Sequence, residues 1–149
     1  MRQQKRRRFA HLDAGEYQQL ASFRFALRSF LRFSEIAAEK VGLSAQHYQA
    51  LLAVCATTDG HVTINDLAKQ LLIRHNSAVG LVDRLVHGGL VVRKPSTVDR
   101  RKVELCLSAR GRKVLARLAA MHHGELRRIG PVMEQFFSGL TREPGDAGD

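Results

Sequence analysis

Cysteine is scarce in this chain of 149 residues, which contains only Cys55 and Cys106. Two isolated cysteines without a CxxC spacing exclude a disulfide framework and indicate a reducing compartment. Long apolar runs are also missing, since none approaches the roughly 18 residues that a membrane span needs. The basic N-terminus lacks the apolar segment of a signal peptide. We therefore expect a cytoplasmic protein with no membrane partner.

Motifs that carry catalysis are absent as well. There is no Ser/His/Asp arrangement, no pair of carboxylates and no glycine-rich phosphate loop, so we expect neither an enzyme nor a cofactor. Four histidines raise the question of a metal: His47, His75, His122 and His123. Their spacing does not match a compact zinc site, and two adjacent histidines point in different directions, so no metal site is expected.

Acidic residues are outnumbered, with 14 Asp and Glu against 24 Lys and Arg, which gives a formal net charge of +10. Five of these positive charges fall within residues 1–8, so the rest of the chain still carries +5. A basic domain is typical of a protein that binds a polyanion, although a cationic surface that only aids solubility fits equally well. Residues 1–13 are predicted to form a flexible basic arm, either a solvated tail or an extra contact to phosphates.

Apolar residues at helical spacing predict a mainly α fold (α+β class) with a small sheet. In chain order we expect helices over about 16–40, 44–56, 63–71, 75–87 and 109–128, and a last one up to about 140. Two strands are expected between the fourth and fifth helices. Gly130 and Pro131 are expected to break or kink the fifth helix, Cys55 is expected to face the core, and residues 141–149 are expected to be disordered.

Residues 63–88 have the pattern of a helix-turn-helix. Thr63 and Asp66 form a capping box for the first helix, and residues 72–74 make a tight connection to the second. In this motif the N-terminal residues of the second helix reach base edges in the major groove. Here they are Arg74, His75, Asn76 and Ser77. Asn can bind adenine with two hydrogen bonds and Ser can bind bases or phosphate, but an ordinary helix start also favours these residues.

Residues 90–107 form a predicted hairpin whose loop contains Asp99, Arg100, Arg101 and Lys102. A hairpin directly after the second helix makes the motif a winged helix-turn-helix. A basic loop of this kind fits the narrow minor groove of DNA, where an inserted Arg is favoured. Lys94 on the first strand is predicted to contact DNA as well. The alternative is an ordinary surface ion pair between Asp99 and Arg101, which contributes little.

Residues 81–111 read LVDRLVHGGLVVRKPSTVDRRKVELCLSARG. This segment resembles the MarR family of bacterial transcriptional regulators, whose pattern is approximately LVDRLxxxGLVxRxxxxxDRRxxxVxLTxxG. The resemblance extends over about residues 16–140. It implies a sequence-specific, homodimeric DNA-binding regulator whose helices over about 16–40 and 108–140 interlock between subunits. Two recognition helices then read an inverted repeat in double-stranded DNA.

The resemblance also implies roles for the wing residues. Arg101 would enter the minor groove and Asp99 would hold it, while Arg100 and Lys102 are better placed for phosphates. An Asp beside a long Arg preorganises a side chain that otherwise loses rotamer entropy on binding. Asp83 and Arg84 fit a structural pairing or a phosphate contact better than base reading.

A small-molecule effector is the remaining partner that the resemblance implies. Its pocket would lie between the dimerisation helices and the winged-helix lobe, with Phe30, His47, Tyr48 and Leu51 as candidates. A redox role for either cysteine is a weaker alternative, because neither lies where oxidant-sensing relatives carry theirs.

This chain departs from the family pattern at Gly80, which lies in the middle of the recognition helix where many relatives carry a polar side chain. The C-terminal helix is also short. The main alternative function is a winged-helix module that binds nucleic acid without sequence preference, and competition by random-sequence DNA separates the two.

Overall fold

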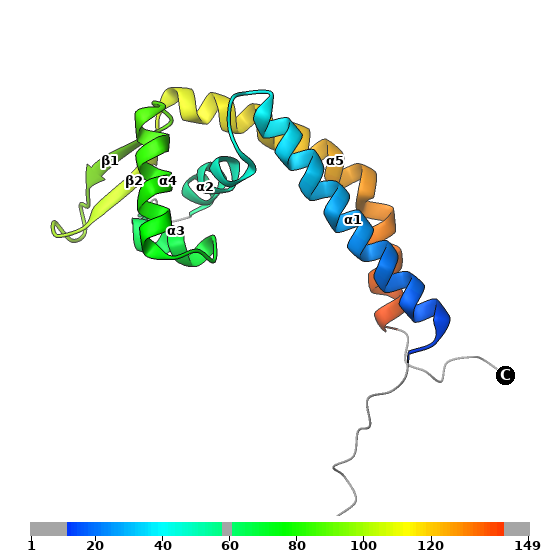
Figure 1. The fold of residues 1–149 in the computed structure, drawn as a ribbon. Coiled ribbons are helices and arrows are strands. Elements are labelled where there is room, and N and C mark those ends of the chain that lie inside the picture. The colour runs from blue at the N-terminus through cyan, green and yellow to red at the C-terminus, as the bar shows by residue number, and fades with distance from the viewer. Residues whose placement is uncertain (1–11, 58–60, 142–149) are drawn as a thin grey trace, which may run out of the picture. The chain divides into compact units, whose positions relative to one another are not determined.

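The computed structural model describes residues 12–57 and 61–141, and its elements are labelled in Figure 1. The chain packs as two compact units. Residues 12–32 and 125–141 make up the described part of the first unit, and the second unit spans Phe33–Gly124 apart from the gap. Helices α1 (Ala14–Glu39) and α5 (Ala109–Thr141) contribute to both units.

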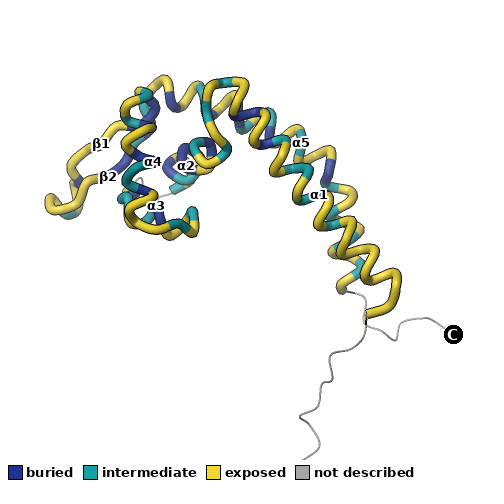
Figure 2. The backbone as a smooth tube through the Cα atoms, in the orientation of Figure 1, coloured by how far each residue is buried: buried dark blue, intermediate teal, exposed yellow. Residues whose placement is uncertain are grey.

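The second unit contains a winged helix-turn-helix, which confirms the predicted fold class. Its elements are α2 (Ala45–Ala56), α3 (Ile64–Gln70), α4 (His75–His87), β1 (Val91–Pro95) and β2 (Val103–Leu107). Figure 2 shows that the buried segments of these elements face one another. The largest fully buried side chains are Leu51, Leu67, Leu81, Leu85, Leu105, Leu118, Val62, Val82 and Val91. Each contributes about 1.5–3 kcal/mol to stability through its burial.

Side-chain caps determine where α2 and α3 begin. The Ser44 side chain accepts the backbone N–H of His47, and the Thr63 side chain accepts that of Asp66. In both cases the third helical residue bonds back to the cap, which makes two capping boxes. The predicted capping box of Thr63 and Asp66 is therefore confirmed. Gly42 follows α1 with a φ of +75°, the left-handed conformation that ends many helices.

The wing is a two-stranded antiparallel sheet that pairs Val91 with Leu107 and Pro95 with Val103. Val62, just before α3, forms an isolated bridge with Leu105, whose N–H donates to the Val62 carbonyl over 2.7 Å. Strict alternation along β2 would place Val103 inside and Glu104 outside. Instead Val103 is 47% exposed and Glu104 is buried, because Glu104 contacts the partners described below.

Helix α5 runs without interruption to Thr141, so the predicted break at Gly130 and Pro131 does not occur. Pro131 has no N–H to donate to the Arg127 carbonyl, but residue 127 is exposed and water can satisfy that acceptor. Beyond the proline, Phe136 stacks on Phe23 of α1 with ring centroids 4.3 Å apart. This packing within the first unit stabilises the helix past the point where local preference would end it.

Cys55 is exposed rather than core-facing, which corrects the prediction for it. The buried arc of α2 runs through Ala50, Leu51 and Val54, and Cys55 lies at the edge of that arc in the last turn. Most of the predicted arm and tail falls outside the described residues. No helix in the described ranges is both long and apolar enough to span a bilayer.

Candidate nucleic-acid interface

The N-terminal turn of α4 presents the four predicted base-reading residues to solvent. Arg74, His75, Asn76 and Ser77 are all exposed, because the inner face of α4 is anchored in the core by Ala78, Leu81, Val82 and Leu85. Arg74 occupies the N-cap position and makes no side-chain cap hydrogen bond. The first N–H groups of α4 therefore lack the internal cap that α2 and α3 have, and such groups bind anions.

Farther along α4, Gly80 is not required by any internal contact. A Cβ built there meets its nearest heavy atom, Arg84 Nη1, at an ordinary 3.7 Å. Asp83 pairs with Arg93 of β1 through a short hydrogen bond to Oδ1. This pair links the recognition helix to the wing, as the structural alternative for Asp83 predicted.

The loop at the tip of the wing is organised by Asp99. Its Oδ1 accepts the backbone N–H of Arg101 over 3.1 Å, and its carbonyl accepts the N–H of Lys102 over 2.9 Å. The Arg101 Nε lies 3.5 Å from the same carboxylate oxygen. That distance is too long for a strong hydrogen bond, so Asp99 orders the backbone of the turn through the Arg101 N–H, while the Arg101 side chain stays exposed. The structure thus brings the predicted pair together.

The loop carries a concentration of exposed positive charge. The Arg101 side chain is 94% exposed, and Lys94, Arg100 and Lys102 are exposed beside it. All the predicted DNA-contacting residues belong to the second unit. Figure 1 shows the hairpin next to α4. The contacts that these residues make with DNA stay a prediction.

Ser96 supports this loop, and sequence reasoning missed it. It is buried, its Oγ accepts the N–H groups of Val98 and Asp99 over 3.1 Å each, and its own N–H donates to the Lys102 carbonyl. A serine after a proline at the end of a strand is a local turn signal that could have identified it.

A second missed contact joins the wing to the segment before α3. His61 Nδ1 lies 2.8 Å from Glu104 Oε1. Hydrogen bonds from Ser96 and His61 lower the pKa of the Glu104 carboxyl. Glu104 is therefore an ionised acceptor near neutral pH that ties β2 to both partners. Because His61 is distant in sequence, no local pattern could have identified the pair.

The base of the wing is fixed to α5 by a tight joint. Ser108 caps α5 by accepting the N–H of Gly111 over 2.9 Å, and its hydroxyl donates to the Gly89 carbonyl over 2.6 Å. The Ser108 N–H donates to the Leu90 carbonyl over 3.0 Å. A Cβ on Gly111 would lie 2.0 Å from that carbonyl oxygen, so only glycine fits here.

The four candidate ligand-pocket residues occupy different surroundings. Phe30 is half-buried on α1. Leu51 is fully buried in the core, and the buried Tyr48 ring stacks on His122 at a centroid distance of 4.0 Å. His122 is itself buried, and its Nδ1 and Nε2 bond the Leu118 carbonyl and the Ser34 hydroxyl. A ligand-binding role for the four candidates stays a prediction.

His47 is the fourth candidate, and it also completes the α2 capping box. Its Nδ1 accepts the Ser44 N–H over 3.0 Å, which requires that nitrogen to be unprotonated. Burial and the positive charge of Arg84 lower the pKa of His47 below its ordinary value. The folded state therefore binds fewer protons than the unfolded state. Neutral His47 therefore contributes to the free energy of unfolding. This contribution is fully present above the pKa of His47 in the unfolded state, and it is lost as the pH falls through the lower pKa of His47 in the folded state.

We predict that His47→Gln reduces the pH dependence of stability below about pH 6.5, the ordinary pKa of His. Gln retains the capping-box acceptor but does not titrate. The unfolding midpoint of the wild type should fall by about 1–3 °C more than that of the variant between pH 7 and pH 5. Circular dichroism melts at the two pH values measure this, and parallel shifts in both proteins would refute it.

The sequence profile of the MarR family matches residues 41–102, from the turn after α1 to the tip of the wing. The chain is 27% identical over 128 residues to the HTH-type transcriptional repressor YetL of Bacillus subtilis (strain 168), a match that covers 86% of this chain and 75% of YetL.

Solved structures show the same fold. MepR, a transcription regulator of the Staphylococcus aureus multidrug efflux pump MepA, matches with a TM-score of 0.69 at 18% identity, over 80% of this chain and 90% of MepR. A MepR–DNA complex matches with a TM-score of 0.64 at 20% identity, over 80% and 88% of the two chains. CouR from Rhodococcus jostii RHA1, bound to p-coumaroyl-CoA, matches with a TM-score of 0.64 at 26% identity, over 75% and 81%.

Proposed function

We propose that this chain is a transcriptional regulator of the MarR family, to which its sequence is similar, and that it is a homodimeric repressor that binds an inverted repeat and responds to a small molecule. The observation that carries the proposal is the pairing of two exposed cationic features on one unit. These are the uncapped N-terminus of α4 and the Asp99-ordered loop of the wing. A role on DNA places the protein in the cytoplasm.

Each feature suits a different groove. The first turn of α4 enters the major groove, where Asn76 and Ser77 can bond base edges and the free N–H groups can bond a phosphate. The wing lies over the neighbouring minor groove, where Arg101 inserts. Arg100, Lys102 and Lys94 neutralise phosphates and add affinity without sequence preference. The pair between Asp83 and Arg93 connects the two features.

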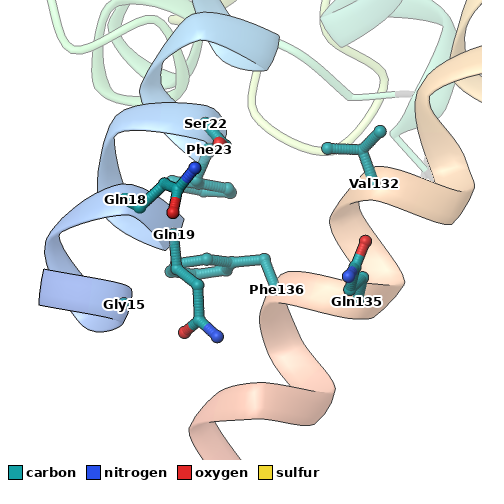
Figure 3. A pocket seen from close by; sticks show the side chains of 8 residues that line it. All are labelled: Gly15, Gln18, Gln19, Ser22, Phe23, Val132, Gln135 and Phe136. Carbon is teal, nitrogen blue, oxygen red and sulfur yellow. The ribbon is translucent and has the colours of Figure 1, made fainter.

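The proposal of a homodimer rests on the first unit. Among its described residues only Ala26 and Ile129 are buried, which is too small a core to fold alone. Large apolar side chains are exposed on both of its helices: Tyr17, Leu20, Phe25, Leu31, Leu126, Val132, Phe137 and Leu140. A groove of about 340 Å³ lies between α1 and α5, and Figure 3 shows Gln19, Phe23 and Phe136 among the side chains that line it. A second copy of these helices would cover the apolar side chains.

A two-fold dimer presents its recognition helices to half-sites about one helical turn apart, roughly 34 Å. A ligand that binds better to one spacing of the helices shifts the population toward it, and DNA affinity changes by the same coupling free energy. CouR is a relative bound to an acyl-CoA, which supports a small-molecule effector here. The polar edge of His47 and the ring of Tyr48 on α2 are the groups we assign to it.

Selection of bound duplexes from a random-sequence library tests this function. We expect enrichment of two half-sites in inverted orientation, with centres about 10 base pairs apart, and two chains bound per duplex. A basic module without sequence preference would enrich no motif. That second function is favoured only by the net charge, and an unenriched pool would establish it in place of the first.

A further inference from the structure

The turn between α3 and α4 contains an unusual residue, Leu72. Its φ is +54°, and Leu72 is the one residue other than glycine with a positive φ among those described. A side chain with a Cβ is disfavoured in this region. Leu72 is also 92% exposed, more than any other large apolar residue in the described ranges. Neither property is offset by packing within the molecule.

The same turn occurs three times in the described part of the chain, which allows a direct comparison. In each, the left-handed residue donates its N–H to a carbonyl three residues back, and the next residue donates to one five residues back. Gly42 and Gly89 occupy the left-handed position after α1 and α4, with φ values of +75° and +69°. Only the helix-turn-helix has a leucine there, so the geometry of the turn does not explain this choice.

The surroundings of Leu72 indicate what covers it. Lys69, Gln70, Arg74 and His75 are exposed around it, and no acidic residue occurs from residue 67 to residue 82. Leu72 lies only three residues before His75, where α4 begins. Such a cationic surface is complementary to a polyanion such as DNA. A partner protein with an acidic or apolar surface is less suitable, because it would not use the predicted base-reading groups next to Leu72.

Given the function proposed above, on which this inference rests, we propose that Leu72 is a specificity-determining residue that contacts a thymine methyl group in the major groove. The methyl group on C5 is the one apolar group that a base pair presents in this groove, and it is read by apolar side chains. The exposed Leu72 then supplies readout that the recognition helix lacks at Gly80, where no side chain projects.

The test uses a duplex selected from random sequence by the full-length wild type. Leu72→Gly should raise the unfolding midpoint by about 2–4 °C, because glycine relieves the left-handed backbone. It should lower affinity for the selected duplex about tenfold, since a dimer loses two apolar contacts. Leu72→Asn, which adopts this conformation readily, should lose the same affinity, whereas Leu72→Met should retain it.

Replacing thymines of the selected duplex by deoxyuridine, one at a time, identifies the contact. We expect one position in each half-site at which this replacement lowers the affinity of the wild type about threefold. At the same position the replacement should not change the affinity of Leu72→Gly. The inference is overturned if Leu72→Gly binds as tightly as the wild type, or if no thymine shows a loss that depends on Leu72. If the wild type selects no duplex, the proposed function fails first, so the two failures are distinguishable.

Discussion

Replacing Arg101 by alanine is expected to lower affinity for the selected inverted repeat about 100-fold at physiological salt. A charge-assisted hydrogen bond to a fixed acceptor contributes roughly 1.5–3 kcal/mol, a dimer inserts two wings, and 1.4 kcal/mol corresponds to a factor of ten. The side chain is 94% exposed, and its 3.5 Å ion pair with Asp99 is a surface pair that contributes little to stability. The unfolding midpoint should therefore stay within about 1 °C of the wild type. Fluorescence anisotropy titrations measure the loss.

Arg100→Ala is the matched control, because Arg100 is adjacent, exposed and equally charged. If Arg100 contacts a phosphate, Arg100→Ala should weaken binding to selected and random duplexes alike. The slope of the logarithm of the binding constant against the logarithm of the salt concentration should become shallower by about one per chain. Arg101→Ala should instead reduce the preference for the selected duplex. Equal effects of the two substitutions on both duplexes would show that Arg101 is only one more phosphate contact.

Replacing Gly111 by alanine is expected to destabilise the fold by at least about 3 kcal/mol, because the new methyl group overpacks the joint and breaks its hydrogen bonds. The added Cβ would lie 2.0 Å from the Leu90 oxygen and 3.0 Å from its carbonyl carbon. Neither atom can move freely, since Leu90 donates its N–H to the Leu85 carbonyl and accepts that of Ser108. We expect the unfolding midpoint to fall by roughly 10 °C.

Gly124→Ala provides the control for this substitution within the same helix. Apart from the backbone of its own helix and its chain neighbours, no heavy atom lies within 4 Å of a Cβ at Gly124, so alanine should stabilise α5 by up to about 1 kcal/mol through its higher helix propensity. The two substitutions differ only in what the methyl group meets. If Gly111→Ala melts within 2 °C of the wild type, the close approach of α5 to Leu90 is not a feature of the folded protein.

The helix-turn-helix could be predicted from the sequence because its determinants are local. Thr63 and Asp66 cap α3 from three residues apart, and the inward residues of α4 recur at helical spacing. The wing could be predicted for a similar reason, since its basic loop and flanking strands are contiguous. Asp99 and Arg101, two residues apart, meet as the pattern implied.

What could not be predicted depends on residues far apart in the chain. Glu104 is buried because it meets His61, 43 residues earlier, whereas strand alternation alone placed it outside. Helix α5 continues through Pro131 because Phe136 stacks on Phe23 of α1. In both cases a tertiary contact outweighs the local preference.

A competition measurement shows whether this protein recognises a particular DNA sequence. Labelled selected duplex is bound by the wild type at physiological salt and displaced by unlabelled duplexes of equal length. We expect that displacement by the random-sequence duplex needs a concentration at least about 1,000-fold higher than displacement by the selected duplex. If the two concentrations differ by less than about tenfold, the protein does not recognise a sequence, and only the sequence-independent attraction of cations to phosphates remains.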